Sequence, residues 1–332
     1  MPLDLEASII KVDQLVEGVL KDDRRAIARL ISLIENDSPE GLSAVKCLYP
    51  HAGKAYVVGV TGPAGCGKST LIYRLASEFR KRGKTVGVVA IDPTSPFSGG
   101  ALLGDRIRMQ NLSTDEGVYI RSMATRGTLG GLARATADAV RVLDASGKDV
   151  VFVETSGAGQ SEVDVIKVAH TVLVVMAPGL GDDIQASKAG MMEIGDIFIV
   201  NKADRDNADR AVEEIQAMIE LGAQEGHWRP PVIKATAISD RGVENVIKKI
   251  EEHKEYLNRT SGKEKLVRRS ETELVEALKY RLNDRLMAEL RKDTNFAKLV
   301  GRVAAKKVDP YSAADRLVSE YIRKGRRSRK KP

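Results

Sequence analysis

The chain has 332 residues, long enough to bury a full hydrophobic core and longer than one ordinary domain. Its net charge of +7 is concentrated in the basic stretch 324–331, and with aromatic residues at only 4% we expect a solvated tail in preference to a nucleic-acid-binding arm. Cys47 and Cys66 alone make no disulfide framework or cysteine metal site, and without a signal peptide or an apolar run of about 18 residues we expect a protein of the reducing cytoplasm.

Residues 5–50 have the apolar spacing of helices. The apolar positions recur every three or four residues, as Ile9, Val12, Val16 and Val19 and then as Ile27, Leu30, Ile31 and Ile34. Ser38 before Pro39 is typical of an N-cap followed by the first position of a third helix. We expect an N-terminal helical extension over residues 1–53.

Residues 54–257 alternate between strand-like and helix-like runs. The strand-like runs cover residues 55–60, 85–91, 118–121, 149–154, 171–176, 197–200 and 232–236. This alternation predicts an α/β domain with a mostly parallel sheet and helices on both faces. A ligand of such a sheet binds at the carboxyl ends of the strands.

The stretch 62–69 fits the pattern G-x-x-x-x-G-K-[ST] and lies between a predicted strand and a predicted helix over residues 70–82. Its N–H groups and the helix N-terminus can converge on phosphate oxygens. Lys68 would hold the β and γ phosphates, and Ser69 would ligate Mg²⁺. A Gly-rich turn matching by chance is the alternative, which the flanking elements disfavour. The predicted nucleotide contacts here are Gly62, Pro63, Ala64, Gly65, Cys66, Gly67, Lys68, Ser69 and Thr70.

Three acids follow predicted strands or lie in a Gly-rich segment. Asp92 follows the run 85–91, Asp105 lies in the segment 99–106, and Glu154 opens Glu-Thr-Ser-Gly where most GTPases carry D-x-x-G. An acid at the strand end is suited to Mg²⁺, and the Gly157 N–H can face the γ-phosphate. Solvated loop acids are the alternative, more for Asp92 and Asp105 than for Glu154.

The tetrapeptide 201–204 follows the strand-like run 197–200 and fits the guanine-specificity pattern N-K-x-D. Asp204 can accept two hydrogen bonds from the guanine N1–H and 2-amino group, while the Lys202 stem covers the base. Alone, the tetrapeptide could mark a helix start; behind a phosphate loop it favours GTP over ATP. The predicted base-side contacts are Asn201, Lys202 and Asp204, with a backbone N–H from Thr236, Ala237 and Ile238.

The strand pattern stops near residue 258. Residues 270–273, Ser-Glu-Thr-Glu, predict a capping box that opens a helix, and a further helix is expected near Asp309 and Pro310. The first helix carries Leu274, Leu278, Leu282, Leu286 and Leu290. We expect a helical arm over 258–324, packed on the chain itself or serving dimerisation, and a basic tail over 325–332.

Together these residues closely resemble the cobalamin-associated GTPases that serve methylmalonyl-CoA mutase, the family of MeaB and MMAA with the older label ArgK, a transport-system kinase. The resemblance covers nearly the whole chain. Its most specific stretches are residues 92–96 through 104–106, 121–127, 154–162 and 178–185.

The resemblance implies a Mg²⁺-dependent GTPase and metallochaperone that forms a homodimer through its C-terminal helices. It implies a methylmalonyl-CoA-type mutase as partner, with gated adenosylcobalamin loading and protection of the mutase. Carried over by position, Lys68, Asp92, Asp105 and Glu154 are catalytic, and Ser69 and the three acids hold the metal. Residues 177–188 would be a third nucleotide-responsive segment.

Two positions depart from expected patterns. Ala158 and Gly159 precede Gln160, where small GTPases place a water-orienting Gln directly after the glycine, and Ser156 replaces an expected Val. Competing interpretations are a nickel-insertion GTPase, a transport-associated kinase and a nucleotide-dependent module without turnover. The scattered histidines, His51, His170, His227 and His253, lack metal-ligand spacing, and no kinase H-R-D run is present.

Overall fold

The computed structural model describes residues 12–92, 112, 114–124, 131–155, 167–179, 191–222, 228–260 and 262–328. The chain divides into two compact units, residues 1–266 and 267–332. The long helix α12, Gly262–Leu290, begins in the first unit and continues into the second.

The first unit is built on one parallel sheet. Its strands are β1 (Tyr56–Thr61), β2 (Val86–Asp92), β3 (Val118–Ala124), β4 (Val150–Glu154), β5 (Thr171–Met176), β6 (Ile197–Val200) and β7 (Val232–Lys234). Their order is β3-β2-β4-β1-β5-β6-β7, and neighbouring strands pair in parallel. Strands β1, β4, β5 and β6 are buried along their length, as β-branched runs between two helical layers should be. The predicted α/β class is confirmed.

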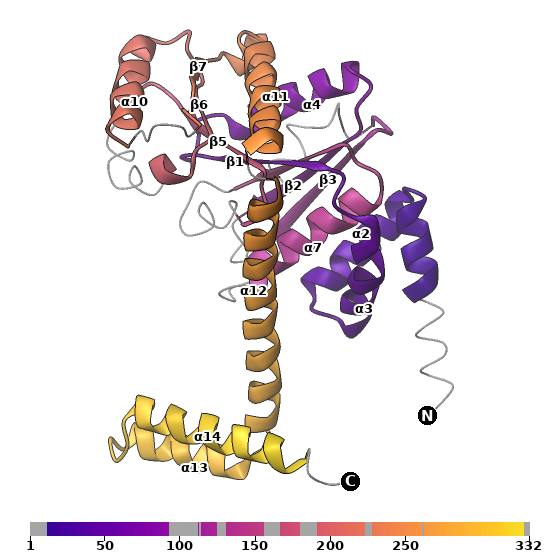
Figure 1. Ribbon diagram of the computed structural model, residues 1–332, viewed down its shortest axis with the longest axis vertical. Helices are drawn as coiled ribbons and strands as arrows, with labels where there is room; N and C mark the ends of the chain where they lie inside the picture. The colour runs from indigo at the N-terminus through magenta and orange to yellow at the C-terminus, as the bar shows by residue number, and fades with distance from the viewer. Residues whose placement is uncertain are drawn as a thin grey trace. The chain divides into compact units, whose positions relative to one another are not determined.

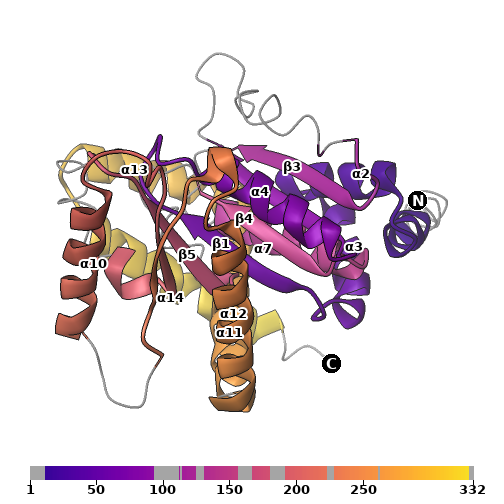
Figure 2. The same cartoon turned by 90° about the horizontal axis from the view of Figure 1, so that it is seen from above.

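Helices cover both faces of this sheet. One face packs against α7 (Gly131–Ala145), and the other packs against α4 (Lys68–Lys81) and α11 (Val243–Thr260). Helix α10 (Ala208–Gly222) contacts β6 and β7, and Figures 1 and 2 place it at the end of the sheet away from β3. The order of strands and helices brings the ends of β1, β4 and β5 together in the middle of the sheet, where ligand sites of parallel sheets form.

The N-terminal helices form a further layer on α7. Residues 12–20 are helical, and α2 (Arg24–Glu35) and α3 (Pro39–Leu48) follow. A short 3₁₀ helix, Tyr49–His51, leads towards β1. The Ser38 side chain accepts a hydrogen bond from Gly41 N, with Pro39 at the first helical position, so the predicted start of α3 is confirmed.

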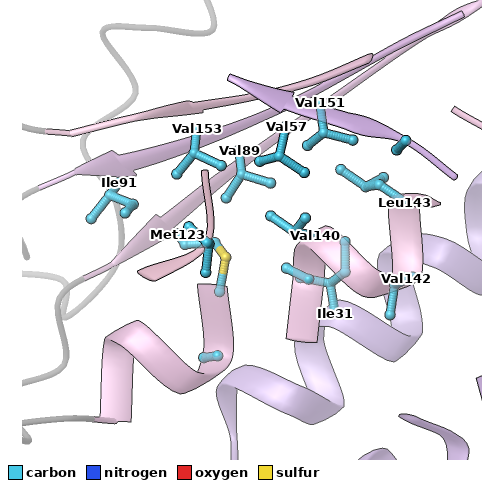
Figure 3. Packing of buried hydrophobic residues seen from close by; sticks show 14 of the residues in the cluster. Ile31, Val57, Val89, Ile91, Met123, Val140, Val142, Leu143, Val151 and Val153 are labelled. Atoms are coloured by element: carbon cyan, nitrogen blue, oxygen red, sulfur yellow. The ribbon is translucent and has the colours of Figure 1, made fainter. Parts of the chain in front are cut away.

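Apolar packing joins this layer to the sheet. Figure 3 shows Ile31 of α2 close to Val140 of α7, with Val57 and Val89 of the sheet beyond it. These side chains are at most 5% exposed, and they belong to one continuous cluster. The helical extension is therefore part of the same folded unit as the sheet.

A partly buried ion pair adds a polar link between the extension and the sheet domain. Lys148 Nζ donates to both carboxylate oxygens of Asp22, at 2.7 and 2.6 Å, and the Lys148 side chain is 2% exposed. The Asp144 carboxylate accepts hydrogen bonds from the backbone N–H groups of Gly53, Lys54 and Ala55. The chain therefore enters β1 along a fixed path.

The second unit consists of helices. It contains most of α12, then α13 (Thr294–Ala304) and α14 (Pro310–Ser328). The capping box expected over residues 270–273 is wrong, because these residues lie inside α12. The run before them is rich in Lys and Arg, which favour helix, and propagation of that helix outweighs a local cap. Leu274, Leu278 and Leu282 are at least half exposed.

Candidate nucleotide-binding site

The stretch 62–69 connects β1 to α4 at the carboxyl edge of the sheet. Gly62 has φ +138°, and a Cβ there would overlap the Val175 carbonyl oxygen of β5. Gly67 has φ +97° at the N-cap of α4, and a Cβ there would overlap Asn201 Nδ2. Glycine is therefore required at both positions, for backbone conformation and for close approach.

Lys68 lies in the first turn of α4 with its ammonium group folded back over the loop. Its Nζ donates to the carbonyl oxygens of Gly62 and Pro63, at 2.8 and 3.0 Å. The residue is 6% exposed. The loop thus holds a buried positive charge at the helix N-terminus, where the backbone N–H groups also favour an anion.

Ser69 and Glu154 meet behind the loop. Ser69 Oγ donates to Glu154 Oε1 at 2.7 Å, and both residues are buried. Glu154 is the last residue of β4 and lies in register with Val60 of β1, so the sheet itself sets its place. Beyond it, Thr155 N donates to Val60 O at 3.1 Å, which joins the ends of the two central strands.

Asn201 ties the loop to the far side of the site. Its Nδ2 donates to Cys66 O at 2.9 Å, and its Oδ1 accepts from Ala237 N at 3.0 Å. Asn201 is 2% exposed. One buried amide therefore fixes the distance between the phosphate loop and the loop that follows β7.

The rest of the N-K-x-D stretch forms a turn. Lys202 has φ +57°, and its Nζ donates to Gly65 O at 2.7 Å, while Asp204 is exposed. Helix α10 begins only at Ala208, so the alternative of a helix start at residues 201–204 is wrong. Thr236 and the short 3₁₀ helix Ala237–Ser239 lie opposite, with the Ile238 side chain 77% exposed.

Some predicted site residues fall outside the described part of the chain. Asp92 ends β2, next to β4, but its side chain is not described. Asp105, Gly157 and Gln160 lie outside the described residues, as do residues 180–188 of the third expected segment. The structure brings together the phosphate loop, Glu154, Asn201 and the loop at residues 236–238; the roles of Asp92, Asp105 and Gly157 stay predictions.

The site contains one thiol. Cys66 is fully buried in the phosphate loop, and burial raises the pKa of its thiol above the usual value, against the opposing effect of the nearby Lys68 charge. The other cysteine, Cys47, is exposed on α3. The two thiols therefore differ strongly in accessibility.

A second polar cluster lies at the opposite edge of the sheet, where β1 and β5 begin. Tyr56 Oη and Thr171 Oγ1 are 2.5 Å apart, and Thr171 Oγ1 lies 2.8 Å from His253 Nδ1. His253 Nε2 lies 3.3 Å from an Asp196 carboxylate oxygen. Burial raises the pKa of Tyr56 to about 12. His253 is therefore a core histidine that joins α11 to the sheet, as expected for a histidine without ligand spacing.

Sequence reasoning missed Arg74, which lies on α4 two turns after the phosphate loop. Its guanidinium donates to Ile238 O and to the Asp240 carboxylate, at 3.0 and 3.1 Å. A basic residue on a helix surface carries no motif, so the contact becomes visible only when α4 and the loop after β7 are placed together.

A phosphate loop between the central strand and α4, with an Asn-Lys-x-Asp turn after β6, on a parallel sheet covered on both faces, is the architecture of P-loop GTPases. The family profile described as "Methylmalonyl Co-A mutase-associated GTPase MeaB" matches residues 27–295. The chain belongs to the MeaB family, and the resemblance drawn from its motifs is confirmed.

Relatives and a solved structure agree with this assignment. A Pyrococcus abyssi protein named as a GTPase is 52% identical, covering 94% of this chain and 97% of the relative. The Caenorhabditis elegans protein named "Methylmalonic aciduria type A homolog, mitochondrial" is 30% identical and covers 94% of this chain and 83% of the relative. The crystal structure of a LAO/AO transport system kinase shares the fold, with a TM-score of 0.68, 23% identity, and coverage of 95% of this chain and 98% of the other.

None of the helices in the described ranges has the length and apolar character needed to cross a membrane. Nor do the described His, Cys, Asp and Glu side chains form a group of three or more that could hold a metal ion.

Proposed function

We propose that the chain binds GTP at the phosphate loop and hydrolyses it to GDP and phosphate with Mg²⁺. The observation that carries this proposal is the meeting of Lys68, the Ser69–Glu154 pair and Asn201 around one loop at the carboxyl edge of the sheet. Lys68 would exchange its bonds to the Gly62 and Pro63 carbonyl oxygens for bonds to the β and γ phosphates. The backbone N–H groups of residues 64–70, at the loop and the N-terminus of α4, would hold the remaining phosphate oxygens.

The residues behind the loop fit a magnesium ion. Ser69 Oγ and the Glu154 carboxylate offer buried oxygen atoms 2.7 Å apart, and Mg²⁺ takes oxygen ligands. We assign them to the metal together with Asp92 and Asp105. When bound, the ion supplies positive charge that neutralises the phosphate oxygens. Glu154 holds its carboxylate in place because β4 pairs with β1 on one side and with β2 on the other.

Guanine would bind between the turn at residues 201–204 and the loop at 236–238. Asp204 is exposed and able to accept from the guanine N1–H and 2-amino group, and the Lys202 stem would cover the base. Ala237 N–H is already bonded to Asn201, so the loop would offer its next N–H, that of Ile238, to the base carbonyl. Adenine lacks the donors that Asp204 requires, which favours GTP over ATP.

We further propose that this GTPase is a cytoplasmic metallochaperone, with a methylmalonyl-CoA-type mutase as its partner, and that it gates adenosylcobalamin loading and protects the mutase. Support comes from the family description and from the related protein named for methylmalonic aciduria. Residues 177–188 would report the nucleotide state to the mutase. This segment begins directly after β5 and is followed by residues 191–194 in helical conformation, so it starts at the nucleotide edge of the sheet.

We propose a homodimer formed through the C-terminal helices. Leu274, Leu278 and Leu282 are 70, 55 and 50% exposed on α12, an apolar stripe that a second copy could bury. The proposed organisation is an N-terminal extension over 1–53, a GTPase domain over 54–257, a dimerisation arm over 258–324 and a basic tail over 325–332.

Phosphate release by the purified chain tests the proposed activity. We expect release from GTP in the presence of Mg²⁺, little release from ATP, and loss of release when EDTA removes the ion. Equal turnover of ATP and GTP would contradict the base-side assignment. Binding of GTP without any release, alone or with a partner, would instead favour a nucleotide-dependent module without turnover.

Capture from native lysate tests the partner. The immobilised chain is loaded with a non-hydrolysable GTP analogue, and a second sample with GDP is the control. We expect to recover a cobalamin-dependent acyl-CoA mutase, and to recover more of it with one nucleotide than with the other, since a switch requires different affinities for the partner in its two states. Recovery of a hydrogenase or urease maturation protein would instead favour the alternative of a nickel-insertion GTPase.

A further inference from the structure

Arg74 bridges the first helix after the phosphate loop and the loop after β7. Its Nη2 donates to Ile238 O at 3.0 Å, and its Nη1 donates to Asp240 Oδ2 at 3.1 Å. The Arg74 Nε is buried and has no hydrogen-bond partner within the described residues, so the guanidinium is held by its two outer nitrogens. The side chain itself is 30% exposed.

The loop that Arg74 contacts is packed at Thr236 and Ala237, which are buried, but its outer part from Ile238 onward is held little by side-chain packing. The Ile238 side chain is 77% exposed, and Asp240 adopts φ +60° at the end of the short 3₁₀ helix. On the inner side the loop is fixed by Asn201, which accepts from Ala237 N. On the outer side, the carbonyl of Ile238 is held by Arg74. These two contacts grip consecutive residues from opposite sides.

A surface ion pair alone would carry little weight here. The Asp240 carboxylate is 60% exposed, and such pairs are weakened by water and salt. The bond to Ile238 O is different, because it fixes a backbone group at the position proposed for base recognition. Its effect should therefore show in nucleotide affinity more than in the stability of the fold.

We propose that Arg74 is a positioning residue for guanine recognition. It holds the loop at residues 236–238 against α4, so that the loop keeps its distance from the turn at residues 201–204. This inference rests on the proposed guanine-nucleotide site. It adds a residue outside the nucleotide-binding motifs that sets how well the base fits while leaving phosphate binding to the loop at 62–69.

The test compares Arg74→Met with a matched control on the same helix. Arg82 also lies at α4, as its C-cap, and pairs with Glu251 of α11 at 3.0 Å without touching the loop. Each variant is titrated with GDP and with inorganic tripolyphosphate, which occupies the phosphate site and has no base. Steady-state GTP turnover gives KM and kcat, and thermal unfolding without nucleotide checks the fold.

We expect Arg74→Met to raise the Kd for GDP and the KM for GTP about five- to tenfold, the size expected when one ordinary, partly solvent-exposed hydrogen bond is lost. Tripolyphosphate affinity and kcat should stay within about twofold of wild type. The GDP affinity of Arg74→Lys should lie between those of wild type and Arg74→Met, because a single ammonium group replaces a fork of two nitrogens. Arg82→Met should match wild type in all these measurements.

GDP affinity of Arg74→Met within twofold of wild type would overturn the inference. So would an equal loss of GDP and tripolyphosphate affinity, because that result would mean a disturbed fold and no specific effect on the base. A wild-type chain that binds tripolyphosphate and not GDP would refute the proposed guanine site itself, and with it this role of Arg74.

Discussion

Truncation of Asn201 to alanine tests whether one buried amide holds the two sides of the site together. The change removes the donor to Cys66 O and the acceptor for Ala237 N. Asn201 and Ala237 are each 2% exposed, and Cys66 is fully buried, so water reaches these groups poorly. The predicted result is a less stable chain whose phosphate loop and base-side loop are no longer linked.

The structure gives the size of the effect. Each of the two hydrogen bonds contributes about 1 kcal/mol net, and a buried partner left unsatisfied costs about 1–3 kcal/mol. Two bonds with partial relaxation of the orphaned groups give a loss of about 2–4 kcal/mol in the free energy of unfolding. That would be a large part of the stability of a typical domain.

Urea unfolding of the chain without nucleotide, followed by fluorescence and circular dichroism, measures this loss. Lys202→Met is the matched control. It changes the neighbouring residue and removes the hydrogen bond from Lys202 Nζ to Gly65 O, which also reaches the phosphate loop but is less buried than the Asn201 bonds. We expect that control to lose less than about 1 kcal/mol. Asn201→Asp should not restore the wild-type stability, since a carboxylate oxygen would face the Cys66 carbonyl oxygen. If Asn201→Ala lost no more stability than Lys202→Met, the buried Asn201 amide would not hold the phosphate loop and the loop after β7 together.

Three further predictions follow from single contacts. Glu154→Gln should abolish GTP turnover with the fold intact, because the amide is a poor metal ligand; unchanged phosphate release would exclude Glu154 from the metal site. A thiol reagent at neutral pH should label exposed Cys47 and spare Cys66, whose thiol has a raised pKa through burial; peptide mass spectrometry showing equal labelling would contradict this. The hydrogen bond from Arg80 lowers the pKa of Asp115 below its usual value, so wild type should be more stable than Asp115→Asn at neutral pH and lose that advantage as the pH falls through the lowered pKa. A difference in urea midpoint that stays constant across pH would contradict this.

The sheet and the phosphate loop could be predicted because their signals are local. A β-branched run, a glycine-rich loop and a helical run follow one another within residues 55–82, and each keeps its character in the folded chain. The same holds for Ser38 and Pro39 at the start of α3. Where a few adjacent residues decide the backbone, sequence is sufficient.

The contacts that couple the parts of the site could not be predicted in this way. Asn201 and Arg74 reach the loop after β7 from elements far apart in the sequence, and only the sheet order brings them together. The helix expected near Asp309 and Pro310 is confirmed as α14. The prediction for the start of α12 was wrong for another reason. In α12 a capping signal at Ser270 was outweighed by helix-forming neighbours, and α13 was not foreseen as a separate helix.

The most direct test of guanine recognition by the turn at residues 201–204 is a comparison of GTP and xanthosine triphosphate turnover by wild type and Asp204→Asn. Asp204 accepts from the guanine 2-amino group in this account, and an asparagine amide would instead donate to the 2-oxygen of xanthine. We predict that the preference for GTP over xanthosine triphosphate falls by at least about tenfold in the variant, with kcat for the favoured nucleotide retained. An unchanged ratio of kcat/KM for the two nucleotides would contradict guanine recognition at this turn.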